Sequence, residues 1–166
     1  MRRLLILAGI FFFTSVQSQV VTMSVRHVQQ VAAGGQGPEM LTDGDMSSST
    51  NWTESAEWSI AGGVASYDNT AGGTLAQADG DMVSSIAINT DYDLAFDVSN
   101  LTGSNAYFWV ESSDGGIEYI GQMSISNGPY SLDFTTGGDV GIKGFRIRAL
   151  DDGAFDIDNI SLKEDL

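Results

Sequence analysis

Apolar and polar residues alternate in short runs along most of this 166-residue chain, and this pattern constrains its fold more than any other feature. From residue 91 to residue 98 every second residue is apolar, and Asp91, Asp93 and Asp97 stand between them. Successive side chains of a β-strand point to opposite faces, so such a run has one buried face and one face in water. Residues 145–149 and 155–158 repeat the alternation. The pattern predicts antiparallel sheets whose inner faces form a core.

Glycine pairs and Asp-Gly or Asn-Gly steps separate these runs at a spacing of about 8 to 15 residues, which is typical of an all-β sandwich or barrel. No segment after residue 40 has the apolar periodicity of a helix. The other predicted strands cover residues 57–60, 64–67, 82–88, 107–111, 117–122 and 131–135. Residues 40–166 are therefore predicted to form one all-β domain.

The first residues have the layout of a secretory signal. Arg2 and Arg3 precede an apolar run over residues 4–13, and a short polar stretch with small residues follows up to Ser18. The run is shorter than the ~20 apolar residues of a membrane span. Residues 1–18 are predicted to be a signal peptide or, if retained, a hydrophobic anchor, and residues 19–39 a leader or tether. Cleavage predicts a secreted, extracellular protein.

The charge of the chain excludes one class of partner. Asp and Glu number 22 against 7 Lys and Arg, which gives a net charge of -15. A surface this negative is repelled by a phosphate backbone and releases few counterions on binding it, so nucleic acid is not an expected partner.

Several catalytic chemistries are also excluded. The chain has no cysteine, so it has no disulfide, no thiol nucleophile and no cysteine-built zinc site. His27 is the single histidine and lies in the predicted leader, which leaves the β domain without an imidazole base. Two-carboxylate glycosidase chemistry stays open by composition. No nucleophile, base and orienting group can be named together, so the domain is predicted not to be an enzyme.

Four separated segments carry a family resemblance. Residues 38–46, PEMLTDGDM, are followed by Trp52 and by the hairpin-like stretch 57–69, and then by TDYDLAFDVSN at 90–100 and AFDIDNISLKE at 154–164. In this order they resemble the jelly-roll carbohydrate-binding modules attached to bacterial xylanases and endoglucanases. Similar sequences are common in viral tail, fibre and capsid-surface proteins. The resemblance implies an antiparallel β-sandwich of jelly-roll type, and it implies a ligand only loosely.

The resemblance also implies a structural calcium site. The first and last strands are neighbours in the resembled fold, which would bring Asp158 to the Gly44 carbonyl and to Asp45, with Asp43 in the same acidic turn. Calcium prefers such carboxylate and carbonyl oxygens. The family commonly has an aromatic residue and then Glu after the Gly-Asp pair, whereas this chain has Met46 and Ser47, so one expected carboxylate is missing. The alternative is that these aspartates are solvated turn residues.

A candidate sugar-binding surface follows from parity and residue type. Tyr107 and Trp109 have the parity opposite to Phe108 and Val110. One pair must face away from the core, and the amphipathic pair suits that position better. Arg146 and Arg148 are also outward and could donate to sugar hydroxyls, oriented by Asp97 or Glu111. The alternative is that the arginines only pair across strands with Asp97 or Asp156 and that Trp109 is in the core.

The predicted function is that of an exported, non-catalytic module that binds a glycan or another cell-surface polysaccharide and is stabilised by calcium. The alternative is a virion-surface structural protein, such as a fibre, spike or decoration protein, docked through its N-terminal segment to other structural chains. In that case the virion surface is the expected location.

Overall fold

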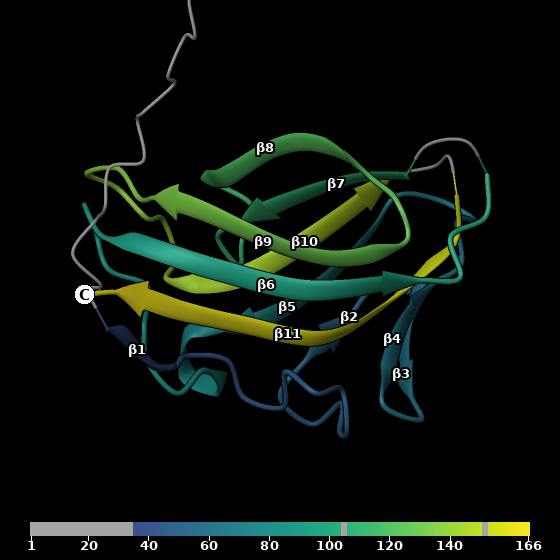
Figure 1. Ribbon diagram of the computed structural model, residues 1–166, viewed down its shortest axis with the longest axis horizontal. Coiled ribbons are helices and arrows are strands. Elements are labelled where there is room, and N and C mark those ends of the chain that lie inside the picture. The colour runs from purple at the N-terminus through teal and green to yellow at the C-terminus, as the bar shows by residue number, and fades with distance from the viewer. Residues whose placement is uncertain (1–34, 104–105, 151–152) are drawn as a thin grey trace, which may run out of the picture. The chain divides into compact units, whose positions relative to one another are not determined.

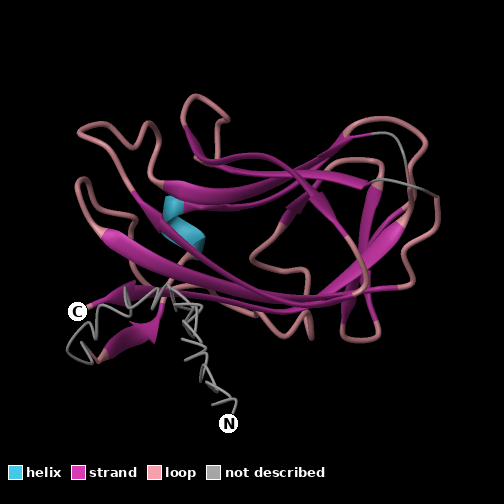
Figure 2. Cartoon of the chain, turned by 45° about the horizontal axis from the view of Figure 1, so that its top comes forward, coloured by secondary structure: helices cyan, strands magenta, loops and turns pink. Residues whose placement is uncertain are grey.

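The computed structural model describes residues 35–103, 106–150 and 153–166. The predicted signal or anchor and residues 19–34 of the predicted leader lie outside these ranges. The described residues form two antiparallel sheets that face one another (Figures 1 and 2). Their one helix is a single 3-10 turn, η1 (Asp79–Asp81). Within these ranges no helix has the length and apolar character needed to span a membrane.

The first sheet, here called sheet A, contains the longest strands. Its strands pair antiparallel in the order β3 (Trp58–Ala61), β4 (Val64–Tyr67), β11 (Phe155–Asp165), β6 (Asp91–Ser99) and β9 (Gly128–Thr135). A short strand, β1 (Gln36–Glu39), pairs with the far end of β11. The outer face of this sheet is the face directed away from the second sheet.

The second sheet, sheet B, lies behind sheet A in Figure 1. Its strands pair antiparallel in the order β2 (Thr53–Glu54), β5 (Gly73–Ala78), β10 (Gly144–Leu150), β7 (Ala106–Glu111) and β8 (Glu118–Ile125). The predicted all-β sandwich is therefore confirmed, and both β7 and β10 lie in sheet B.

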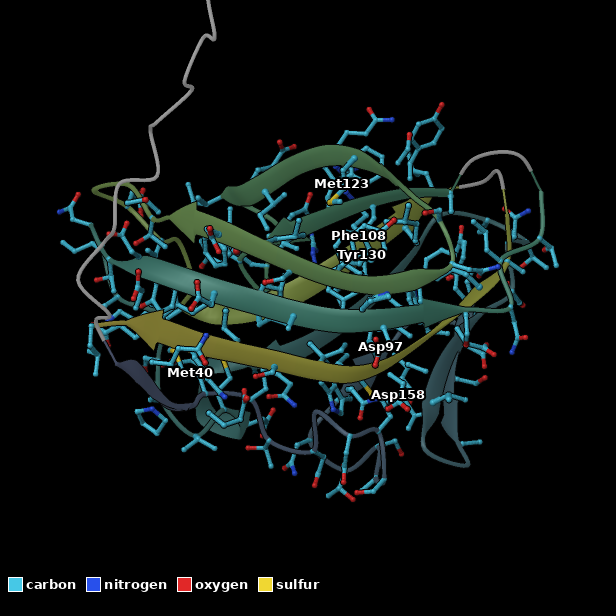
Figure 3. All side chains as sticks on the ribbon, viewed as in Figure 1. Met40, Asp97, Phe108, Met123, Tyr130 and Asp158 are labelled. Atoms are coloured by element: carbon cyan, nitrogen blue, oxygen red, sulfur yellow. The ribbon has the colours of Figure 1, made fainter. Side chains whose placement is uncertain are left out.

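The core fills the space between the two sheets with the apolar residues of the alternating runs. In β6 and β10 every second side chain is buried, as the alternation predicts. The Phe96 ring stacks on Tyr130 in its own sheet and on Phe108 in sheet B, with centroids 4.9 and 5.0 Å apart (Figure 3). Such contacts hold the two sheets at a fixed distance. The residues that alternate with the core residues are then left on the outer faces.

The two ends of the domain lie side by side. The Met40 N–H donates to the Leu162 carbonyl at 2.9 Å, next to the pairing of β1 with β11. The Glu39 carboxylate accepts the Leu162 N–H at 2.9 Å and the Ser161 hydroxyl at 2.5 Å. A Cβ on Gly44 would lie 2.0 Å from the Ile160 carbonyl oxygen, so this approach requires glycine.

One predicted strand is wrong. Residues 82–88 form a loop that pairs with no strand. Met82 and Ile86 are buried, whereas Val83 is 64% exposed and Ile88 is also exposed. The apolar residues of this loop resemble those of a strand. The Ala87 N–H, however, donates to the Tyr92 hydroxyl at 2.7 Å and not to the backbone of a neighbouring strand.

Three strands were not expected where they occur: β1, the two-residue β2, and β5. Strand β5 lies inside sheet B, between β2 and β10, but Leu75, Ala76 and Gln77 are all buried, so the segment shows no alternation. The Gln77 side chain accepts the Thr42 N–H at 3.1 Å and donates to the Thr42 carbonyl, which explains a fully buried amide. Strand β1 begins at Gln36, inside the predicted leader and before the predicted start of the domain at residue 40.

Candidate functional site

The four residues predicted to bind a ligand come together on the outer face of sheet B. Tyr107 and Trp109 are in β7, and Arg146 and Arg148 are in the adjacent strand β10. In the register of this pair Arg148 lies opposite Trp109, and Arg146 lies opposite Glu111. The alternate residues of β7, which are Ala106, Phe108 and Val110, belong to the core cluster, whereas Tyr107 and Trp109 do not. The outward parity of the predicted pair is therefore correct.

Glu111 orients both arginines. One carboxylate oxygen accepts from Arg146 Nε at 3.0 Å and from Arg146 Nη2, and the other accepts from Arg148 Nε at 2.9 Å. Glu111 is only 2% exposed, although it lies on the outer face of the sheet. A buried carboxylate needs such partners, and its charge-assisted hydrogen bonds are stronger than neutral ones. Asp97 and Asp156 lie in sheet A, so the alternative partners considered from sequence are wrong.

Arg148 also covers Trp109. Its guanidinium carbon lies 4.3 Å from the centroid of the indole, which is the geometry of a cation–π contact. The Tyr107 ring lies 6.5 Å from the Trp109 ring at an angle of 51°. Trp109 is 6% exposed, while Tyr107 is half-buried. The surface therefore presents a guanidinium and a phenol, and the indole lies beneath them.

The turn after β7 forms one side of this site. Gly115 has a φ of +75°, and a Cβ there would lie 1.5 Å from Arg146 Nη2. Only glycine fits against the guanidinium in that conformation. The sequence marks residues 114–116 as a turn, but nothing in it indicates that the turn packs on Arg146.

Asp114 shapes the same turn. Its carboxylate accepts the Ser112 hydroxyl at 2.6 Å and the Gly116 N–H at 3.1 Å. These two hydrogen bonds, with a smaller contribution from the charge of Arg146, hold the pKa of Asp114 below its usual value of 3.8. The turn is thus ordered by an ionised aspartate next to the arginines.

Glu118 lies at the start of β8, beside the same arginine. Its Oε1 is 3.7 Å from Arg148 Nη2, which is too long for a hydrogen bond, and its side chain is largely exposed. It is therefore a much weaker partner of Arg148 than Glu111 is.

The residues predicted to bind calcium lie near the joined ends of the chain. The Gly44 carbonyl accepts the Ile160 N–H at 2.8 Å, two residues after Asp158. The Asp43 carboxylate accepts the Asn51 amide at 2.7 Å. The Asp158 carboxylate accepts the N–H of its neighbour Asn159 at 2.5 Å. The chain thus brings the acidic turn to β11, as the prediction required.

Each of these groups already has a protein partner. Asp45 accepts the Ser47 N–H at 3.1 Å, and hydrogen bonds from Ser47 hold the pKa of Asp45 below its usual value. In the described part of the chain, no three acidic or histidine side chains converge in a way that could hold a metal ion. Calcium at this place stays a prediction.

The outer face of sheet A has a different chemistry. Asp93 lies directly opposite Asp133. Asp97 lies directly opposite Asp158, and both are labelled in Figure 3. The first pair lines a pocket of about 280 Å³ together with Asp91, Asp165 and the neighbouring residues Tyr92, Phe134 and Thr135. The hydrogen bond that protonated Asp133 donates to Asp93, followed by the charge of Asp93, raises the pKa of Asp133. The alternation of residues 91–98 predicts only that this face meets water, and the pocket also needs Asp133 from β9 and Asp165 from β11.

Comparison with known proteins supports the fold. No protein-family model and no curated protein matches the chain. Among solved structures, the N-terminal cellulose-binding domain of a Cellulomonas fimi β-1,4-glucanase is similar with a TM-score of 0.53 and 13% identity, over 80% of this chain and 98% of that domain. The xylan-binding CBM22-1 domain of Paenibacillus barcinonensis Xyn10C is similar with a TM-score of 0.51 and 13% identity, over 80% and 96%. The predicted likeness to carbohydrate-binding modules is thus confirmed for the fold.

Proposed function

We propose that this protein is a non-catalytic glycan-binding module and that the outer face of sheet B is its contact surface. The observation that carries the proposal is the network of Arg146, Glu111, Arg148 and Trp109. A sheet face that only meets water does not require a carboxylate that is 2% exposed beneath two guanidinium groups. Planar donors held in place on rigid strands lose little freedom on binding, and such preorganisation favours recognition of hydroxyl groups.

The arrangement of charge supports the choice of this face. On the outer face of sheet A, Asp93 lies opposite Asp133 and Asp97 lies opposite Asp158, so most of these charged groups are acceptors, although Lys163 lies beside Asp93. The outer face of sheet B offers the N–H groups of Arg146 and Arg148 and the hydroxyl of Tyr107. A saccharide presents both donors and acceptors, and it fits the mixed face better. The similar domains described as cellulose-binding and xylan-binding make β-linked oligosaccharides the first ligands to test.

The test is a glycan array probed with the full chain, followed by titration of any ligand found. We expect binding that is lost in Arg148→Ala and in Trp109→Ala. Lys163→Ala is the matched control, because it removes a cation from β11 in sheet A and should leave binding unchanged. An array on which the wild-type chain binds no glycan would overturn the proposal.

Export and the virion alternative concern the N-terminal segment. A secreted module should lose residues 1–18, whereas a virion component should keep them and associate with other structural chains. The mass of the native protein separates the two, because an intact N-terminus in the mature form contradicts secretion by cleavage.

A further inference from the structure

The Trp109 side chain is covered in the free protein, although it is the largest aromatic side chain of the proposed surface. The guanidinium of Arg148 lies over the ring at 4.3 Å, and only 6% of the residue is exposed. A sugar ring that approaches this surface therefore meets Arg148 before it meets the indole. What holds the arginine in this position decides what the ligand contacts.

A chain of contacts fixes Arg148 from one side. Gly115 packs against the guanidinium of Arg146, and Arg146 donates through Nε and Nη2 to one oxygen of Glu111. The other oxygen of Glu111 accepts Arg148 Nε at 2.9 Å. An exposed arginine side chain otherwise has many rotamers of similar energy. Glu111 is thus the group that selects one of them.

We infer that Glu111 is a positioning residue of this surface: it holds Arg148 flat on Trp109, so that a ligand contacts the guanidinium and Trp109 acts as its support. The consequence for glycan binding rests on the proposed function. The hold of Glu111 on Arg148 is a property of the free protein and can be measured without a ligand.

Glu118 provides the matched comparison, because it is the other carboxylate beside Arg148 but lies 3.7 Å away and is largely exposed. Glu111→Gln and Glu118→Gln remove the same charge from the neighbourhood of the same arginine. Only the first alters a group that is hydrogen-bonded to Arg148: glutamine keeps one acceptor oxygen and places an NH2 donor where Glu111 has its second, so it cannot accept from both arginines as Glu111 does. A role that depends on position predicts different results for the two variants, whereas a role that depends on charge alone predicts similar ones.

The experiment labels the three tryptophans of the full chain with 5-fluorotryptophan and follows them by 19F NMR, with the Trp109 signal assigned from Trp109→Phe. In E111Q we expect the Trp109 signal to move and its solvent isotope shift to increase towards that of an exposed indole. In E118Q we expect the wild-type signal. In titrations with cellohexaose and xylohexaose we expect E111Q to weaken binding by about tenfold, and E118Q by less than about twofold.

A Trp109 signal that is unchanged in E111Q, or that moves equally in E118Q, would overturn the inference. If E111Q does not fold, Arg148→Lys takes its place, because lysine keeps the charge but lacks the planar group that covers the ring. An unchanged Trp109 signal in R148K is then the contrary result. If the wild-type chain binds no glycan, the proposed function fails by itself, and the NMR comparison still decides whether Glu111 positions Arg148.

Discussion

The two outer faces of the sandwich are built from the same alternating pattern, yet they hold their charges differently. On sheet A Asp93 lies between Asp133 and Lys163, and Asp97 lies opposite Asp158, so like charges face each other in two of these three pairs. On sheet B Glu111 lies opposite both Arg146 and Glu118, but its carboxylate is hydrogen-bonded to Arg146 and Arg148, and Glu118 is largely exposed. Like charges directly opposite are destabilising, and opposite charges are stabilising. The comparison teaches that hydrogen-bonded pairing of charges, and not the number of charged residues, distinguishes the face of sheet B from that of sheet A.

Among the variants considered, removal of Glu111 should have the largest effect on stability, and it should separate the two faces most clearly. In Glu111→Ala, Arg146 and Arg148 lose their shared partner within a largely buried site, and we expect a loss of about 3 to 5 kcal/mol in the free energy of unfolding. In Asp97→Ala, on the other face, we expect a change within about 0.5 kcal/mol. Urea denaturation of the two variants measures both values. Equal losses would show that the two faces do not differ in the proposed way.

Calcium bound at Asp43, Gly44, Asp45 and Asp158 would change the charge repulsion on the outer face of sheet A. A cation there would lie beside the Asp97–Asp158 pair and reduce its repulsion. A ligand that binds only the folded state at a concentration of 100 Kd adds about 2.7 kcal/mol of stability. The predicted result is a higher melting temperature in calcium than in EDTA, and Asp158→Asn should abolish the difference. Identical melting temperatures would remove the calcium site.

Gly115→Ala tests the turn that supports Arg146. Residue 115 has a φ of +75°, and the new Cβ would meet the guanidinium of Arg146. We expect the free energy of unfolding to fall by about 1 to 3 kcal/mol and glycan binding to weaken. Gly138→Ala is the control, because Gly138 has open space around its Cβ position and no positive φ. Thermal unfolding and titration report the two effects. A Gly115→Ala variant with wild-type values would contradict the packing of this turn on Arg146.

Asp133→Asn should have the smallest effect, and that effect should depend on pH. The folded-state pKa of Asp133 is raised above 3.8, so its contribution to stability is present below the unfolded pKa and is lost as pH rises through the folded pKa. The variant should therefore melt slightly above the wild type at pH 7, and the difference should disappear below about pH 3.8. Melting curves from pH 3 to pH 8 test this, with Asp81→Asn as the control. A difference that does not vary with pH would contradict the raised pKa of Asp133.

The faces of the strands could be predicted from sequence because burial in a sheet has a period of two. Parity together with residue type placed Tyr107 and Trp109 on the outside of β7 and Arg146 and Arg148 on the outside of β10. Glu111 was a candidate partner for the same reason. The choice between Glu111 and Asp97 needed the strand order, because β7 is next to β10 whereas β6 is in the other sheet.

The remaining features depend on contacts between distant residues. Strand β5 is covered on both faces, so its sequence lacks alternation, and the buried amide of Gln77 is satisfied only by the backbone of Thr42. Residues 82–88 contain apolar residues but pair with no strand, because Met82 and Ile86 fill the core from a loop. The covering of Trp109 by Arg148 depends on a rotamer that Glu111 selects, and residue types do not encode a rotamer.

Glu39 and β1 hold the start of the domain against β11. These contacts determine how the domain responds to mechanical load. Gln36 is paired with Asp165, so a pull that separates the two ends acts on the first cross-strand pair and opens the ladder one hydrogen bond at a time. The Glu39 carboxylate, bonded to Ser161 and Leu162, is the next point of resistance. Tension between the ends therefore unzips this domain from one corner, and the sheet B surface stays intact until that corner has opened.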